Sequence, residues 1–165
     1  MPQTSAPFLR AAAASLAVAG LAACASAPTA DPTIYHTVRM QLREDADPAK
    51  VEEVMALMRE LGEKVDGVDR FMVGSDLADD YDVSATYVLA GYDAYRTYLF
   101  DPVHLEIDRN GLPLVRNMVS FDVTDAEDAG AAQQRIAQLH KDRVEQVPGL
   151  KELLAQMESY TGEGK

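Results

Sequence analysis

Residues 98–104 read YLFDPVH, and this stretch holds both a helix start and a histidine. Asp101 can act as the N-cap of a helix whose first residue is Pro102. His104 then lies in the first turn, where free N–H groups and the positive end of the helix dipole disfavour a charged imidazole. We therefore expect His104 to be neutral.

A second histidine, His36, lies far upstream in a predicted strand at residues 34–43, which reads IYHTVRMQLR. Alternate side chains of a strand share one face. His36 is the only polar side chain on its face, which it shares with Ile34, Val38, Met40 and Leu42. This face is predicted to point into the core.

The hydrophobic pattern predicts the order β-α-β-β-α-β. After the first strand comes a helix at 48–65 with an apolar stripe, then strands at 70–77 and 83–90 around an acidic turn. A helix at 91–100, a short turn at 102–111 and a last strand at 114–123 complete the domain. Two such halves place both helices on one face of a four-stranded antiparallel sheet and leave the other face open.

Five short features, taken in order, resemble the stress-responsive A/B barrel (Dabb) domain, a dimeric ferredoxin-like α+β barrel. They are HTV at 36–38, DP at 47–48, FMVG at 71–74, YLFDPVH at 98–104 and VSFD at 119–122. The resemblance covers residues 34–123 and implies a homodimer in which two open sheet faces pair. In the first strand that face carries large side chains: Tyr35, Thr37, Arg39, Gln41 and Arg43.

The resemblance also implies where a site would lie. A plant polyketide cyclase of this family uses two histidines and a tyrosine, and motif matching places these catalytic roles on His36, His104 and Tyr98. A ligand would contact the same three residues together with Met58 and Tyr95. Met58 stands where the cyclase has a further tyrosine, and the cyclase's additional histidine has no counterpart near the third strand.

Two classes of function remain open. The first is binding of a small apolar or aromatic molecule, or a role in stress response, without catalysis. The second is a cofactor-independent enzyme, similar to a cyclase or a monooxygenase. A closed interior around His36 would favour the first, and an open tunnel to both histidines would favour the second.

Other polar residues have ordinary expected roles. His140 is expected to be a solvated helix residue, and the tyrosines are expected to pack with their hydroxyls at the rim of the core: Tyr81, Tyr87, Tyr92, Tyr95 and Tyr98. The spacing of the 3 histidines predicts no metal site, and no cofactor motif is found. A net charge of −12 argues against nucleic acid as a partner.

Residues 1–33 are predicted to lie outside the fold and to begin with a targeting segment. The apolar run at 11–21 is too short to span a membrane but is typical of a signal-peptide core. LAAC at 21–24 resembles a bacterial lipobox, and Cys24 is the only cysteine. We expect a signal peptide at 1–23, a lipid on Cys24, a tether at 24–33 and anchoring to a membrane of the bacterial cell envelope, on its periplasmic side. An ordinary secretory signal is the alternative.

The residues after the domain, 124–165, predict a helical C-terminal extension. One helix is expected at 126–146, and the break at Pro148-Gly149 is followed by a second, with an apolar stripe from Leu150 to Met157. The second helix is amphipathic enough to pack on the domain or on a dimer mate. Residues 161–165 are expected to be a frayed end.

Overall fold

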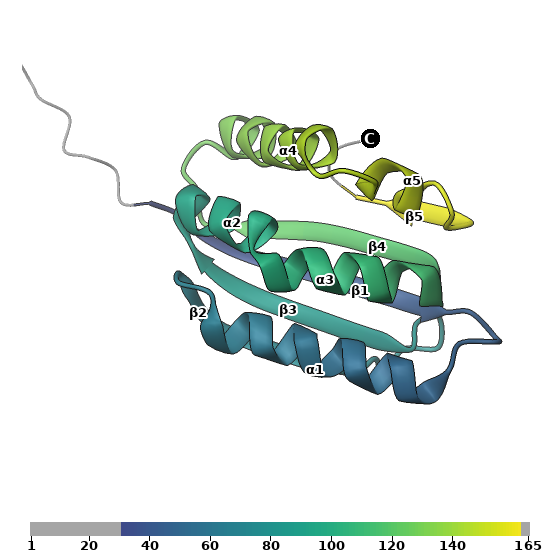
Figure 1. Cartoon of the computed structure of the whole chain (residues 1–165). Helices are drawn as coiled ribbons and strands as arrows, with labels where there is room; N and C mark the ends of the chain where they lie inside the picture. Colours follow the sequence, from purple (N-terminus) through teal and green to yellow (C-terminus); the bar gives the residue numbers. More distant parts are fainter. Residues whose placement is uncertain (1–30, 163–165) are drawn as a thin grey trace, which may run out of the picture.

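The computed structural model describes residues 31–162 (Figure 1). The predicted signal peptide, Cys24 and most of the predicted tether lie outside the described residues. The described tether residues end at Thr33, which already belongs to the first strand.

The elements follow the predicted order and then continue into the extension. The domain consists of β1 (Thr33–Leu42), α1 (Pro48–Lys64), β2 (Val68–Ser75), β3 (Val83–Ala90), α2 (Gly91–Phe100), α3 (Pro102–Gly111), a 3-10 turn η1 (Leu112–Leu114) and β4 (Val115–Thr124). The extension consists of α4 (Ala129–Gln146), α5 (Leu150–Leu154) and β5 (Ser159–Thr161). The α+β prediction is confirmed, and the predicted turn at 102–111 is a full helix.

Two of the helices, α1 and α3, each begin at an aspartate–proline pair, as the sequence predicts. Asp47 accepts a hydrogen bond from the Ala49 amide at 2.9 Å at the start of α1. Asp101 accepts one from the Val103 amide at 2.8 Å at the start of α3. The proline that follows each cap has no N–H to leave unpaired and already has a helical φ. Asp101 therefore fixes where His104 lies.

The sheet has strand order β2-β3-β1-β4-β5. The first four strands pair antiparallel, and β5 pairs parallel with β4. The prediction of a four-stranded sheet was therefore incomplete, because the extension adds a strand. His36 lies opposite Asp122 on β4 and Tyr87 on β3.

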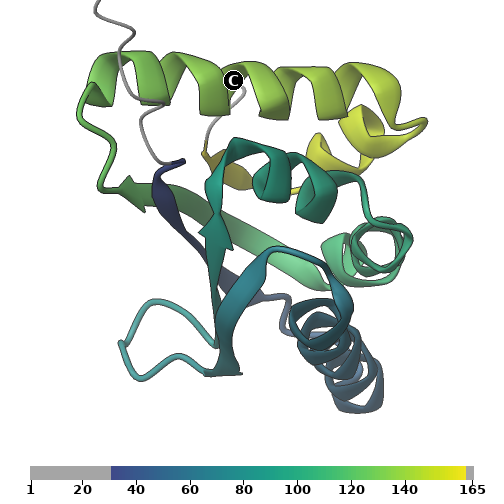
Figure 2. The same ribbon diagram turned by 90° about the vertical axis from the view of Figure 1, so that its left-hand side faces the viewer.

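All the helices lie on the same side of the sheet (Figure 2). In that view they follow one another from α1 through α3 and α2 to α4. The other face carries exposed apolar side chains, of Tyr35, Met72, Phe121 and Val123. This is the open face that the sequence predicts, although it is more apolar than β1 alone indicates.

The extension packs on its own domain. Leu150 and Met157 are buried against Leu112, Val115 and Met118. The second predicted helix ends early, at Leu154, and the chain returns to the sheet. Thr161 pairs with Val119 instead of fraying, because the edge of β4 offers free backbone groups. Within residues 31–162, none of the helices combines the length and the hydropathy that a membrane span needs.

Candidate functional site

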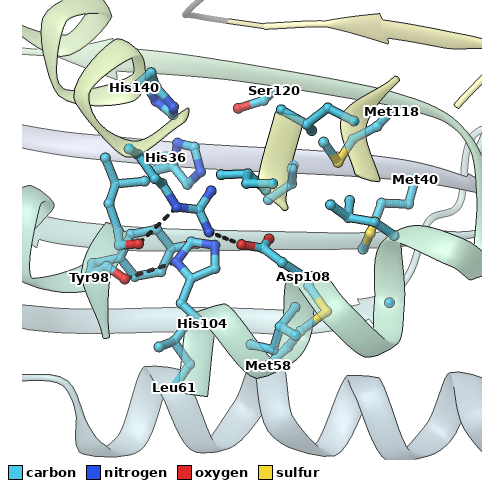
Figure 3. A pocket seen from close by; sticks show the side chains of 18 of the residues that line it. His36, Met40, Met58, Leu61, Tyr98, His104, Asp108, Met118, Ser120 and His140 are labelled. Carbon is cyan, nitrogen blue, oxygen red and sulfur yellow. Dashed lines mark hydrogen bonds and ion pairs between the residues drawn. The ribbon is translucent and has the colours of Figure 1, made fainter. Parts of the chain in front are cut away.

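A narrow cavity of about 80 Å³ lies between the sheet and the helices (Figure 3). Four predicted site residues line it: His36 on β1, Met58 on α1, Tyr98 on α2 and His104 on α3. The fifth, Tyr95, is not among the lining residues. The fold thus brings together residues that are far apart in the sequence.

The cavity has two chemically different ends. Figure 3 shows His36, Tyr98, His104 and His140 at one end. Met40, Met58 and Met118 lie toward the other end. Methionines are apolar and adaptable, so this end suits an apolar group of varied shape.

His104 is held through one ring nitrogen. Its Nδ1 donates to the backbone carbonyl of Tyr98 at 2.9 Å, because a carbonyl oxygen can only accept. Burial lowers the pKa of His104 well below its usual value, and the charge of Arg143 lowers it further. The direction of this pKa shift agrees with the predicted neutral state of His104, but its main cause is burial and not the helix dipole. The lone pair of His104 then resides on Nε2.

His36 belongs to a buried cluster of four polar side chains. Its Nδ1 lies 2.9 Å from Asp122 Oδ1 and 2.9 Å from the Tyr95 hydroxyl. The same hydroxyl lies 3.1 Å from each carboxylate oxygen of Asp122 and 2.6 Å from His140 Nε2. Tyr95 is therefore the hub of the cluster.

The shared protons can be assigned from these contacts. A carboxylate only accepts, so the single hydroxyl proton of Tyr95 points to Asp122. His140 Nε2 then donates to the Tyr95 oxygen, and His36 Nδ1 donates to Asp122. With its proton on Nδ1, a neutral imidazole at position 36 has its lone pair on Nε2.

The prediction of a solvated His140 was wrong, since the residue is only 7 % exposed. Burial lowers the pKa of His140 to about 3. Ala132, Ile136 and His140 follow one another at intervals of four residues and form the buried face of α4. That spacing indicates in the sequence that position 140 is buried, but a polar side chain on a helix is more typical of a solvated residue.

The prediction that the tyrosine hydroxyls lie at the rim was wrong for three of the five. Tyr87, Tyr95 and Tyr98 are fully buried. The Tyr87 hydroxyl donates to the Met58 carbonyl at 2.8 Å, and burial raises the pKa of Tyr95 and Tyr98 well above the usual value.

Sequence reasoning missed Ser120, which lines the cavity from β4. Its side chain is buried, and its Oγ has no hydrogen-bond partner among the described residues. An unpaired buried hydroxyl costs free energy unless a bound molecule supplies the missing hydrogen bond. The only signal in the sequence was alternation, which places Ser120 on the same face as Asp122.

A family model, the stress responsive A/B barrel domain, matches residues 34–125. The chain belongs to the Dabb family. A search of curated proteins finds no match.

Solved Dabb and ferredoxin-like structures show the same fold. A dimeric ferredoxin-like protein of unknown function from Thermobifida fusca is 23% identical, covers 56% of this chain and 91% of its own, and has a TM-score of 0.52. A Dabb family protein from Mesorhizobium loti is 21% identical, covers 56% of this chain and 96% of its own, and has a TM-score of 0.50. A hydroxynitrile lyase from Passiflora edulis is 14% identical, with coverage of 58% and 95% and a TM-score of 0.51.

In this Dabb protein the C-terminal extension, which follows the matched residues, covers one side of the cavity. His140, Arg143 and Val144 of α4, Leu150 and Leu154 of α5 and Tyr160 of β5 all contribute to its wall. His36 is only 3 % exposed and His104 only 8 %. Little solvent therefore reaches either histidine.

Arg143 fastens the extension to the Dabb domain. It forms a buried ion pair with Asp108 of α3, and its Nε donates to the Leu99 carbonyl at 2.8 Å. Burial raises the pKa of Asp108 to about 6, and the positive charge of Arg143 opposes this shift. The pair links α4 to the helices that carry Tyr98 and His104.

Proposed function

We propose that this protein binds one small molecule, mainly apolar but with one carbonyl or hydroxyl group, inside this cavity. The single observation that carries the proposal is a buried hydroxyl in the cavity wall, Oγ of Ser120, which has no hydrogen-bond partner among the described residues. Tyr98 and His104 line the same cavity. A ligand oxygen would supply the missing hydrogen bond to Ser120, and apolar carbon atoms would lie against the methionines.

The volume limits the size of the ligand. A cavity of about 80 Å³ is roughly half the size of an engineered cavity of about 150 Å³ that binds benzene. The cavity therefore suits a molecule of a few carbon atoms, or a larger one only if the extension moves.

A titration with 2-butanone, followed by NMR of the full chain labelled at its histidines, tests this function. We expect saturable shifts of the His36 and His104 ring signals, with a dissociation constant of about 1–10 mM for so small a ligand. Tyr98→Phe and Ser120→Ala should each weaken binding several-fold, because each removes one partner of the ketone oxygen. Tyr92→Phe, which removes a hydroxyl outside the cavity, is the matched control. The absence of saturable shifts at either histidine would contradict the proposal.

A cofactor-independent enzyme of the proton-transfer type is the second candidate. The hydrogen bond from His36 Nδ1 to Asp122 favours it, because a carboxylate at that position orients a histidine whose Nε2 can act as a base. His104 and Tyr98 would then polarise a carbonyl oxygen. Hydrogen exchange in the same ketone distinguishes a binding protein from an enzyme. A binding protein leaves the exchange of its α-protons with D₂O unchanged, whereas an enzyme accelerates it and loses this effect in His36→Gln.

A homodimer is also part of the proposal. Tyr35, Met72, Phe121 and Val123 are between 41% and 75% exposed on the open face, and the similar Thermobifida protein is described as dimeric. Pairing two such faces would bury these side chains.

Light scattering at micromolar concentration should therefore give the mass of two chains. Phe121→Glu should convert the protein to monomers, because it places like charges in the interface. Arg39 lies on the same open face and pairs with Asp76. Arg39→Glu should weaken the dimer, because it reverses the charge on this face and breaks that pair. Exposed Glu145→Gln on α4 should leave the mass unchanged. A monomeric parent protein would contradict this part of the proposal.

Anchoring at the cell envelope is proposed from the sequence, through a lipid on Cys24. Cys24→Ser should abolish partitioning into the detergent phase and change the processing of the precursor. Unchanged membrane association of this variant would mean that no lipid on Cys24 is needed.

A further inference from the structure

The cluster around Tyr95 brings together metal-ligating side chains from four elements. His36 lies on β1, Tyr95 on α2, Asp122 on β4 and His140 on α4. The ligating atoms of His36, Asp122 and His140 all lie within 4.8 Å of one another. Sequence spacing could not predict this, because the fold, not the local sequence, brings the three residues together.

The carboxylate of the cluster has no permanently charged partner among the described residues. The Asp122 side chain is only 6% exposed, and among the described residues its hydrogen-bond partners are His36 and Tyr95. Neither partner carries a permanent positive charge. Arg143, the buried arginine nearby, is already paired with Asp108. A buried carboxylate without a cation is costly, and a bound cation removes that cost.

We propose that Nδ1 of His36, Nε2 of His140 and a carboxylate oxygen of Asp122 bind a divalent first-row transition-metal ion, with the Tyr95 oxygen beside it. Two imidazoles and one carboxylate suit Zn²⁺, Co²⁺ or Fe²⁺. Mg²⁺ and Ca²⁺ prefer sites made of oxygen ligands. The inference does not depend on the ligand proposed for the cavity.

Binding of an ion requires the side chains of the cluster to shift. The Tyr95 oxygen lies 2.6 Å from His140 Nε2 and 2.9 Å from His36 Nδ1, and the three ligating atoms lie within 4.8 Å of one another. Ligands bound to one zinc ion at about 2.0–2.2 Å lie roughly 3.4 Å apart in a tetrahedron, so the short contacts must widen by about 0.5–0.8 Å and the most distant ligating atoms must approach by up to about 1.4 Å. Each imidazole must also carry its proton on the other ring nitrogen.

Such an ion would join the extension to the sheet. His140 is the only ligand from α4, whereas His36 and Asp122 lie on neighbouring strands of the domain. The ion would therefore stabilise the closed position of α4 over the cavity.

Calorimetric titration of the untagged full-length chain with Zn²⁺ tests the proposal. We expect one ion per chain, no binding of Mg²⁺, and a higher melting temperature with Zn²⁺ than without it. His140→Gln and Asp122→Asn should each weaken Zn²⁺ binding by at least about 100-fold, because each removes a ligand. Glu145→Gln, which removes an exposed carboxylate of α4 outside the cluster, should bind Zn²⁺ like the parent.

Co²⁺ provides a second measurement that needs no variant to fold. Bound Co²⁺ should give visible d–d absorption and shift the NMR signals of His36 and His140 in the unmodified chain. No binding of Zn²⁺ or Co²⁺ to the unmodified chain would overturn the proposal and leave a hydrogen-bonded cluster. Binding that survives both His140→Gln and Asp122→Asn would also overturn it, because the ion would then lie elsewhere.

Discussion

Replacing Arg143 by methionine is expected to lower the free energy of unfolding by about 3–5 kcal/mol. The change removes the charged partner of Asp108 and the donor to the Leu99 carbonyl, both in the interior. Methionine keeps most of the side-chain volume, so the loss comes from the unpaired charge. Urea denaturation of the parent and the variant measures it.

Arg135→Met on the same helix is the matched control. Arg135 is exposed and lies over the Tyr92 ring at 4.5 Å. Its loss should cost less than about 1 kcal/mol. The double variant Asp108→Asn with Arg143→Met should recover much of the stability, because no buried charge remains. A single Arg143→Met variant as stable as the parent would mean that the pair does not hold the extension.

Acidification from pH 7 to pH 5 is expected to destabilise the protein through its buried histidines. Burial lowers the pKa of His140 to about 3, whereas an unfolded histidine has its pKa near 6.5. Between these values the unfolded chain binds the proton and the folded chain does not, so stability falls as the pH falls. His140 alone contributes about 2 kcal/mol of destabilisation at pH 5. The lowered pKa of His104 acts in the same direction.

Asp108 acts in the opposite direction, because its pKa is raised to about 6 and the folded state gains its proton first. The difference between the parent and the His104→Gln, His140→Gln double variant isolates the histidines. We expect the double variant to lose less stability between pH 7 and pH 5 than the parent, as measured by urea denaturation at each pH. Parallel losses in the two proteins would show that neither histidine is buried in a neutral form.

Local sequence signals predicted the domain well. Asp47 and Asp101 cap their helices, and alternation placed His36 on the inner face of β1. These features depend on neighbours in the sequence, so a single chain reveals them. The motif at 98–104 likewise predicted a site at Tyr98 and His104, and both residues line the cavity.

The remaining site residues depend on long-range packing. Asp122 meets His36 only because β4 pairs with β1, and His140 meets Tyr95 only because α4 packs across α2. Nothing near His140 distinguishes it from a solvated histidine except its spacing from Ile136. The closure of the cavity could not be predicted either, because it needs the direction in which the extension folds back.

A crystal structure of the protein soaked with 2-butanone would show directly whether the cavity is a binding site. We expect ketone density inside the cavity, with its oxygen within hydrogen-bond distance of the Tyr98 hydroxyl or of Ser120 Oγ, and its carbon atoms against Met58 and Met118. A cavity free of ketone under conditions in which the ketone binds elsewhere on the protein would contradict the proposed binding site.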